Sequence, residues 1–123
     1  MPAGGDAPYV LVADDDDSLR LLCRVNLELD GYEVGEAVSA DDVERELAEH
    51  DVALVLLDVH LGADDGLAIA RKMRSEDGGT RIALFSGSAS LFTPDEAALA
   101  DAVIPKPFSL ESLIATVRSL AAR

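Results

Sequence analysis

The sequence is poor in cysteine, in aromatic residues and in basic residues. Its single cysteine, Cys23, cannot form a disulfide within the chain, so nothing indicates an oxidising compartment. With no tryptophan, two tyrosines and three phenylalanines, the aromatic content gives no support to a site for a flavin ring. The 24 acidic residues outnumber the ten lysines and arginines, and the net charge of −14 argues against nucleic acid and anionic membranes as direct partners.

Long hydrophobic runs are also missing. The longest dense apolar stretch, residues 52–57, is far too short to cross a bilayer, and residues 1–8 lack the basic and apolar regions of a signal peptide. We therefore expect a soluble protein of the cytoplasm. The 123 residues predict one domain, residues 9–123, preceded by a disordered segment, residues 1–8, that is rich in glycine, alanine and proline.

What the sequence does contain is a regular alternation of short apolar runs with amphipathic segments. The apolar runs predict strands at residues 9–13, 32–37, 52–57, 82–85 and 102–104. The amphipathic segments predict helices at residues 18–30, after Ser39, at 66–75, after Thr93 and Pro94, and from Leu110 onward.

The first of these helices carries Leu22, Val25 and Leu29 on one face, and we place Cys23 on its core side. Almost wholly apolar strands that alternate with helices indicate an α/β fold, with a doubly wound parallel sheet of five strands and helices on both faces. Ligands of such sheets bind outside the carboxyl ends of the strands.

Polar residues follow four of the five predicted strands, at the point where each strand ends. The run of residues 14–17 consists of four aspartates after the first strand, and Asp58 follows the third. Residues 86–88 place two serines after the fourth strand, and Lys106 stands between two prolines after the fifth. Because these ends share one edge of a parallel sheet, we expect the side chains to converge.

Converging carboxylates need a cation. Two carboxylates at about 4 Å repel by roughly 4 kcal/mol at an effective dielectric near 20. Mg²⁺ relieves such repulsion, because it takes oxygen ligands from one or two carboxylates and often uses a phosphate as another ligand. A lysine and a hydroxyl at the same place are the usual partners of a phosphoryl group.

Three segments together resemble the receiver domain of response regulators, the phosphoacceptor domain of two-component signalling. Residues 10–20 resemble its first strand and acidic pair, and residues 56–66 resemble its phosphorylation loop. Residues 106–108, Lys-Pro-Phe, resemble its lysine-proline turn. The resemblance covers residues 9–120 and implies a flavodoxin-like sheet with the strand order 2-1-3-4-5.

The resemblance also implies a role for each residue of the site. Asp58 would be the phosphoacceptor. Mg²⁺ would be bound by Asp15 and Asp58 directly, by the backbone carbonyl of His60, and by Asp14 through water. Ser86 and Lys106 would contact the phosphoryl group. Among the four consecutive aspartates, we choose Asp14 and Asp15 as the metal pair because they follow the apolar strand directly.

The implied function is a phosphorylation-dependent switch. Its donor would be a histidine kinase, a phosphotransfer protein or a small acyl phosphate. The chain would assist its own phosphorylation and slow dephosphorylation without acting as an enzyme on other molecules. One departure affects the output: Val103 stands where the family usually has the aromatic residue that changes rotamer on phosphorylation. The downstream effector is not identified by the sequence, and the chain is either a stand-alone receiver or part of a longer regulator.

Two other functions remain open at this point. One is a receiver fold that is never phosphorylated and acts by docking. The absence of an aromatic residue at Val103 is compatible with this function. The other is a phosphatase with an aspartate nucleophile, although that class uses a second acid where this chain has His60. A calcium loop starting at Asp14 is a poor alternative, because Leu19 stands where such a loop needs glycine.

Overall fold

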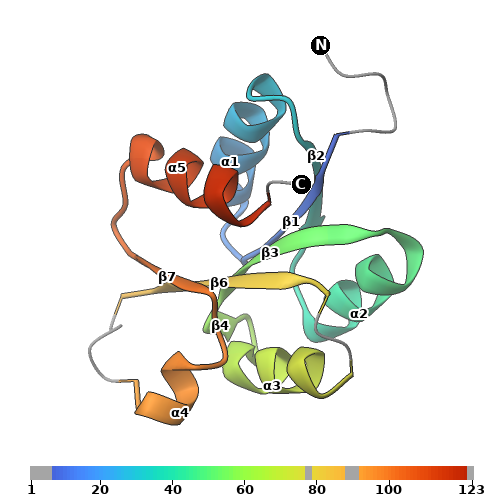
Figure 1. The fold of residues 1–123 in the computed structure, drawn as a ribbon, viewed down its shortest axis with the longest axis vertical. Helices are drawn as coiled ribbons and strands as arrows, with labels where there is room; N and C mark the ends of the chain where they lie inside the picture. The colour runs from blue at the N-terminus through green and yellow to red at the C-terminus, as the bar shows by residue number, and fades with distance from the viewer. Residues whose placement is uncertain (1–6, 77–78, 88–91, 122–123) are drawn as a thin grey trace.

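The computed structural model describes residues 7–76, 79–87 and 92–121, and its centre is a five-stranded parallel sheet (Figure 1). The strand order is β2-β1-β3-β6-β7, which is the predicted order 2-1-3-4-5 once the two short strands β4 and β5 are set aside. The strands of the sheet are β1 (Tyr9–Ala13), β2 (Glu33–Ala37), β3 (Val52–Asp58), β6 (Arg81–Ser86) and β7 (Ala102–Pro105). The predicted doubly wound fold is therefore confirmed.

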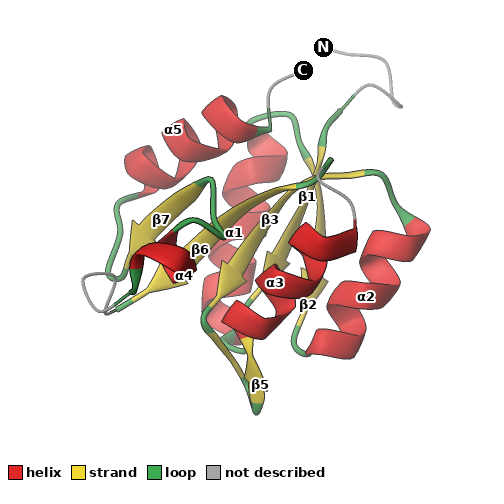
Figure 2. Ribbon diagram, turned by 60° about the horizontal axis from the view of Figure 1, so that its bottom comes forward, coloured by secondary structure: helices red, strands yellow, loops and turns green. Residues whose placement is uncertain are grey.

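Helices cover both faces of this sheet. They are α1 (Asp17–Leu29), α2 (Ala40–Glu49), α3 (Gly66–Glu76), α4 (Pro94–Ala97) and α5 (Leu110–Leu120). Figure 2 shows α1 and α5 on one face and α2 and α3 on the other. Each face has its own buried apolar cluster, because alternate residues of a strand point to opposite sides: Val10 and Val12 meet α1 and α5, whereas Leu11 and Ala13 meet the α2 and α3 side.

The first helix buries the face that carries Cys23 and not the face of Leu22, Val25 and Leu29. Cys23 and Leu27 are fully buried against the sheet, as expected for Cys23. Leu22, Val25 and Leu29 do share a face, but that face is exposed, and Leu29 is 82% exposed. The helix carries two apolar stripes, and packing on the sheet selected the one that contains the smaller side chain of Cys23.

Capping residues define where the helices begin. The side chain of Asp16 accepts from the backbone N–H groups of Ser18 and Leu19, so α1 begins one residue earlier than predicted. Ser39 caps α2 as expected. Thr93 and Glu96 form a reciprocal capping box at α4, which stabilises a helix of only four residues.

A two-stranded antiparallel hairpin, which we did not predict, projects beyond the carboxyl end of β3. It consists of β4 (His60–Leu61) and β5 (Asp64–Asp65) and leads into α3 (Figure 2). Strands of two residues carry no periodicity by which a sequence could reveal them. Residues 1–6 of the predicted N-terminal segment lie outside the described residues. Among the described helices, none has the length and apolar character that crossing a membrane requires.

Candidate functional site

Three aspartates meet at the carboxyl ends of β1 and β3, which are adjacent strands of the sheet. Asp14 directly follows β1 and is fully buried, Asp58 ends β3 and is 9% exposed, and Asp15 is exposed. Each offers a carboxylate oxygen, and these oxygens lie within 4.8 Å of one another. Three like charges at this spacing, two of them buried, repel one another, and the set of oxygen donors fits a hard divalent cation.

Lys106 connects the two buried carboxylates. Its Nζ lies 2.8 Å from Oδ2 of Asp14 and 3.1 Å from Oδ2 of Asp58. The loop that carries Lys106 is attached to the end of β6, because the backbone N–H of Lys106 donates to the carbonyl of Ser86 at 2.9 Å. The ammonium group also lies 5.5 Å from the ring centroid of Phe85, a contact that sequence reasoning did not identify.

The two buried carboxylates are held in the same way. Oδ1 of Asp14 accepts from the backbone N–H of Asp16 at 2.9 Å, and Oδ1 of Asp58 accepts from that of His60 at 3.0 Å. In both residues Oδ2 faces Lys106. Each carboxylate is thus oriented by the backbone two residues further on, which leaves its second oxygen for a cation. The backbone role of Asp16 could have been suspected from this common Asp turn.

Burial and charge interactions have opposing effects on the pKa values of Asp14 and Lys106. Burial raises the pKa of Asp14 above its ordinary value, and repulsion from Asp58 adds to this, while the bonds from Lys106 and from the Asp16 N–H oppose it. Burial alone would lower the pKa of Lys106, but its hydrogen bonds to Asp14 and Asp58 outweigh burial and raise it. Lys106 therefore stays charged, whereas burial and the charge of Asp58 disfavour the ionised form of Asp14.

A hollow of about 410 Å³ opens between the segment that follows β3 and the end of β6. It is lined by residues between β3 and α3, by one residue of α3, by the end of β6 and by a residue shortly before α4, namely Val59, His60, Asp65, Leu67, Ser86, Gly87 and Phe92. Ser86 is buried at the end of β6, and the side chain of His60 is exposed. The predicted serine at position 88 lies outside the described residues. The hollow offers room for a small group between the segment that follows Asp58 and the end of β6.

Val103 lies away from the carboxylates. It belongs to β7, where it pairs with Leu84 of β6, and it is partly buried. The structure therefore brings together the aspartates, Lys106 and the end of β6 at one edge, while Val103 sits in the sheet three residues before Lys106.

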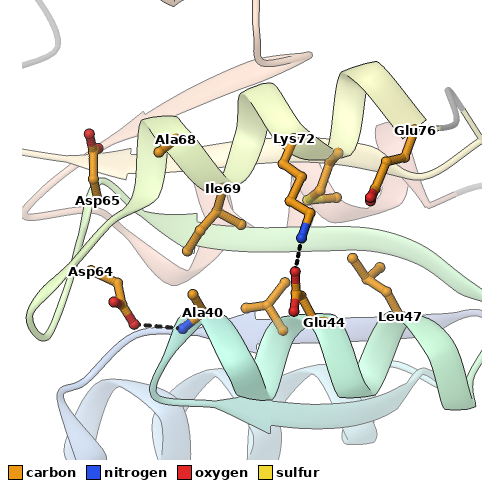
Figure 3. A pocket seen from close by; sticks show the side chains of 11 residues that line it. Ala40, Glu44, Leu47, Asp64, Asp65, Ala68, Ile69, Lys72 and Glu76 are labelled. Atoms are coloured by element: carbon orange, nitrogen blue, oxygen red, sulfur yellow. Dashed lines mark hydrogen bonds and ion pairs between the residues drawn. The ribbon is translucent and has the colours of Figure 1, made fainter.

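A separate groove of about 250 Å³ runs between α2 and α3 (Figure 3). Its apolar wall includes Val43 and Ile69, and an ion pair between Lys72 and Glu44 spans it. Oδ2 of Asp64 accepts from the first backbone N–H of α2, at Ala40, over 2.7 Å. None of the residues predicted for the phosphorylation site lines this groove, and we assign no chemistry to it.

Known proteins similar to this chain are response regulators. The family model of the response regulator receiver domain matches residues 10–118. The transcriptional regulatory protein PrrA of Mycobacterium bovis is 30% identical over 125 residues, an alignment that covers 100% of this chain and 54% of PrrA. The chain thus spans about half the length of this curated relative.

Solved structures agree with the fold. The response regulator TrrA of Thermotoga maritima, in a crystal structure with Mg²⁺-BeF, superposes with a TM-score of 0.83 at 25% identity, covering 92% of this chain and 98% of TrrA. The same regulator in a crystal structure with the histidine kinase ThkA superposes with a TM-score of 0.82 at 24% identity, covering 94% of this chain and 99% of TrrA.

Proposed function

Since the chain belongs to the response regulator receiver family, we propose that its signalling switch operates by phosphorylation of Asp58 in the presence of Mg²⁺. The observation that carries this proposal is the shared hydrogen bonding of Lys106 to Asp14 and Asp58 at the end of adjacent strands. These contacts support the proposal because they join two carboxylates and one cationic side chain, and phosphoryl transfer depends on positioning and on electrostatic stabilisation by such groups.

The covalent step is a displacement at phosphorus. One carboxylate oxygen of Asp58 attacks the phosphorus atom of a phosphohistidine or a small acyl phosphate. A P–O bond to the carboxylate forms, and the bond to the leaving nitrogen or oxygen breaks and its electron pair departs with the leaving group. Lys106 stabilises the negative charge on the transferring group, and the hydroxyl of Ser86 offers it a hydrogen bond.

Three acidic residues support the choice of Mg²⁺ as the cofactor. Asp15 and Asp58, together with the backbone carbonyl of His60, would hold the ion, and Asp14 would contact it through water. When bound, Mg²⁺ neutralises charge on the phosphoryl oxygens. The oxygen-only donor set of the aspartates fits this ion, and the solved structure of TrrA carries Mg²⁺-BeF.

The proposed partners follow from the same chemistry. TrrA was solved in a complex with a histidine kinase, and a histidine kinase or phosphotransfer protein is the donor that we propose for this chain. PrrA is a transcriptional regulatory protein, so a transcriptional output is one candidate for a longer protein that contains this domain. We further propose that the domain resides in the cytoplasm and promotes only its own phosphorylation and slow dephosphorylation.

The test is incubation with a small acyl phosphate and Mg²⁺, followed by the mass of the intact protein. Wild type should gain one phosphoryl group, and Asp58→Ala should gain none. Asp51→Ala is the matched control, because Asp51 is an exposed aspartate just before the opposite end of the same strand; it should be labelled like wild type. No adduct on wild type would favour a docking module, and rapid turnover of varied phosphomonoesters would favour a phosphatase.

A further inference from the structure

A second group of side chains with potential metal-ligand atoms lies at the C-terminal end of α2. Glu46, Glu49 and His50 each offer one ligand atom, and these three atoms lie within 4.8 Å of one another. Glu46 and Glu49 are three residues apart on α2 and share one face, and His50 is the extended C-cap residue that directly follows Glu49. Unlike the aspartates at the end of β1, this group includes an imidazole nitrogen, so its preference among metal ions is different.

Tyr9, at the start of β1, holds two of these three side chains. Its hydroxyl donates to Oε1 of Glu46 at 2.5 Å. Its ring stacks on the imidazole of His50, with ring centroids 4.3 Å apart and planes 10° from parallel. The hydrogen bond leaves the second oxygen of Glu46 for another ligand. The stacking restricts the orientation of the imidazole ring.

The neighbouring strand leaves room for this arrangement at Gly35. A Cβ atom at that position would collide with the hydroxyl of Tyr9 and with the carboxylate of Glu46. Two elements besides α2 therefore shape the position of Glu46.

We propose that Glu46, Glu49 and His50 form a binding site for Zn²⁺. Two carboxylates balance the charge of a dication, and one imidazole favours Zn²⁺ over Mg²⁺, which binds oxygen ligands almost exclusively. Three protein ligands satisfy all but one position of a tetrahedral ion, and water would complete the shell. The bound ion would join the end of α2 to the start of β1 through Tyr9.

This site is distinct from the aspartate cluster. Tyr9 begins β1 and Asp14 follows its end, so the two groups are separated by the length of the strand, about 16 Å at 3.3 Å per residue. Figure 2 shows the C-terminal end of α2 at the edge of the sheet where the strands begin, and the β4–β5 hairpin at the opposite edge. Zn²⁺ and Mg²⁺ should therefore bind independently.

The test is calorimetric titration of the whole chain with ZnCl₂ in buffer that contains excess Mg²⁺, which occupies the oxygen-only site. Wild type should bind one Zn²⁺. His50→Ala should bind it about 10-fold more weakly or worse, and Tyr9→Phe should also lose affinity because Glu46 loses its donor. His60→Ala is the matched control, since His60 is the other histidine of the chain, and it should bind like wild type.

Zinc X-ray absorption of the loaded protein should show one imidazole nitrogen among oxygen ligands, and this signature should disappear in His50→Ala. His50→Ala and His60→Ala each change an exposed histidine, so we expect both variants to fold. Circular dichroism checks that they do. The proposal is overturned if wild type binds no Zn²⁺ at 100-fold molar excess, if His50→Ala binds as tightly as wild type, or if binding disappears in His60→Ala instead.

Discussion

The side-chain nitrogen of Lys106 donates to Oδ2 of Asp58 at 3.1 Å, although 48 positions separate the two residues in the sequence. Because the same nitrogen also contacts Asp14, one cation stabilises two buried carboxylates. The consequences can be tested by measuring stability, metal dependence and dynamics.

Replacing Lys106 should destabilise the metal-free protein. Lys106→Met leaves the carboxylates of Asp14 and Asp58 buried without a cation, and we expect a loss of about 3 kcal/mol in the free energy of unfolding. Urea denaturation measures this loss. Lys72→Met is the matched control, since Lys72 forms an exposed pair with Glu44 and should change stability by less than about 0.5 kcal/mol. Equal losses in both variants would contradict the role of Lys106.

Labelling of the protein by an acyl phosphate should depend on a divalent metal. Chelator should abolish labelling, and Asp15→Ala should do the same even with Mg²⁺ present, because Asp15 supplies a carboxylate to the proposed metal site. Asp17→Ala should be labelled normally, since Asp17 is exposed and pairs with Arg20. Intact mass measures all three, and full labelling in chelator would show that no metal is needed.

The raised pKa of Asp14 should appear in the pH dependence of stability. An acid whose pKa is raised on folding keeps its proton longer in the folded protein, so stability falls as pH rises from about 3.8 through the raised value. Asp14→Asn cannot lose a proton and should not show this fall. Urea denaturation of both proteins without metal, from acid to neutral pH, isolates the contribution of Asp14 as their difference. A constant difference across that range would contradict it.

Gly66 should tolerate no side chain. A Cβ there would collide with the backbone carbonyl of Asp58 and come within 2.8 Å of the Cα of Val59. We expect Gly66→Ala to cost about 1–3 kcal/mol and to displace the phosphorylation loop. Gly87→Ala is the matched control, because among the described residues, the chain neighbours of Gly87 left aside, no atom lies within 4 Å of its Cβ position. Thermal denaturation compares the two, and similar stability of both variants would argue against the close packing at Gly66.

Phosphorylation should leave the rotamer of Val103 unchanged. Val103 is β-branched, stiff at χ1 and part of β7, so it cannot move between exposed and buried positions as an aromatic ring does. We expect the change in residues 86–96 instead, of which residues 88–91 lie outside the described structure. NMR of methyl-labelled protein with and without beryllofluoride measures both. A χ1 change at Val103 without chemical-shift changes in residues 86–96 would contradict this expectation. A spectrum without chemical-shift changes anywhere would favour the docking module.

Periodicity along the chain predicted much of the fold. Each predicted strand agrees with the structure to within one residue at either end, because apolar runs bounded by polar residues are a local signal. The polar residues that follow the strands are a local signal as well. The convergence of Asp14, Asp58 and Lys106 could be predicted from them because the carboxyl ends of parallel strands share one edge of a sheet.

The face that α1 buries was not decided by local sequence. Leu22, Val25 and Leu29 form one apolar stripe, and Cys23 and Leu27 belong to another. Both stripes satisfy helical periodicity, so the pattern alone does not show which of them meets the sheet. Packing against Val10, Val12 and the neighbouring α5 selected the second stripe and left Leu29 in solvent.

The four consecutive aspartates likewise separate what local sequence determines from what tertiary packing decides. By itself the sequence determined that acids follow β1, and it placed two of them at the end of an apolar strand. Only the tertiary structure decided that Asp14 is fully buried while Asp15 is exposed. Burial of a charge depends on a partner, and the partner here is Lys106, 92 positions away, whose contact exists only when β7 lies beside β6 and β1 beside β3.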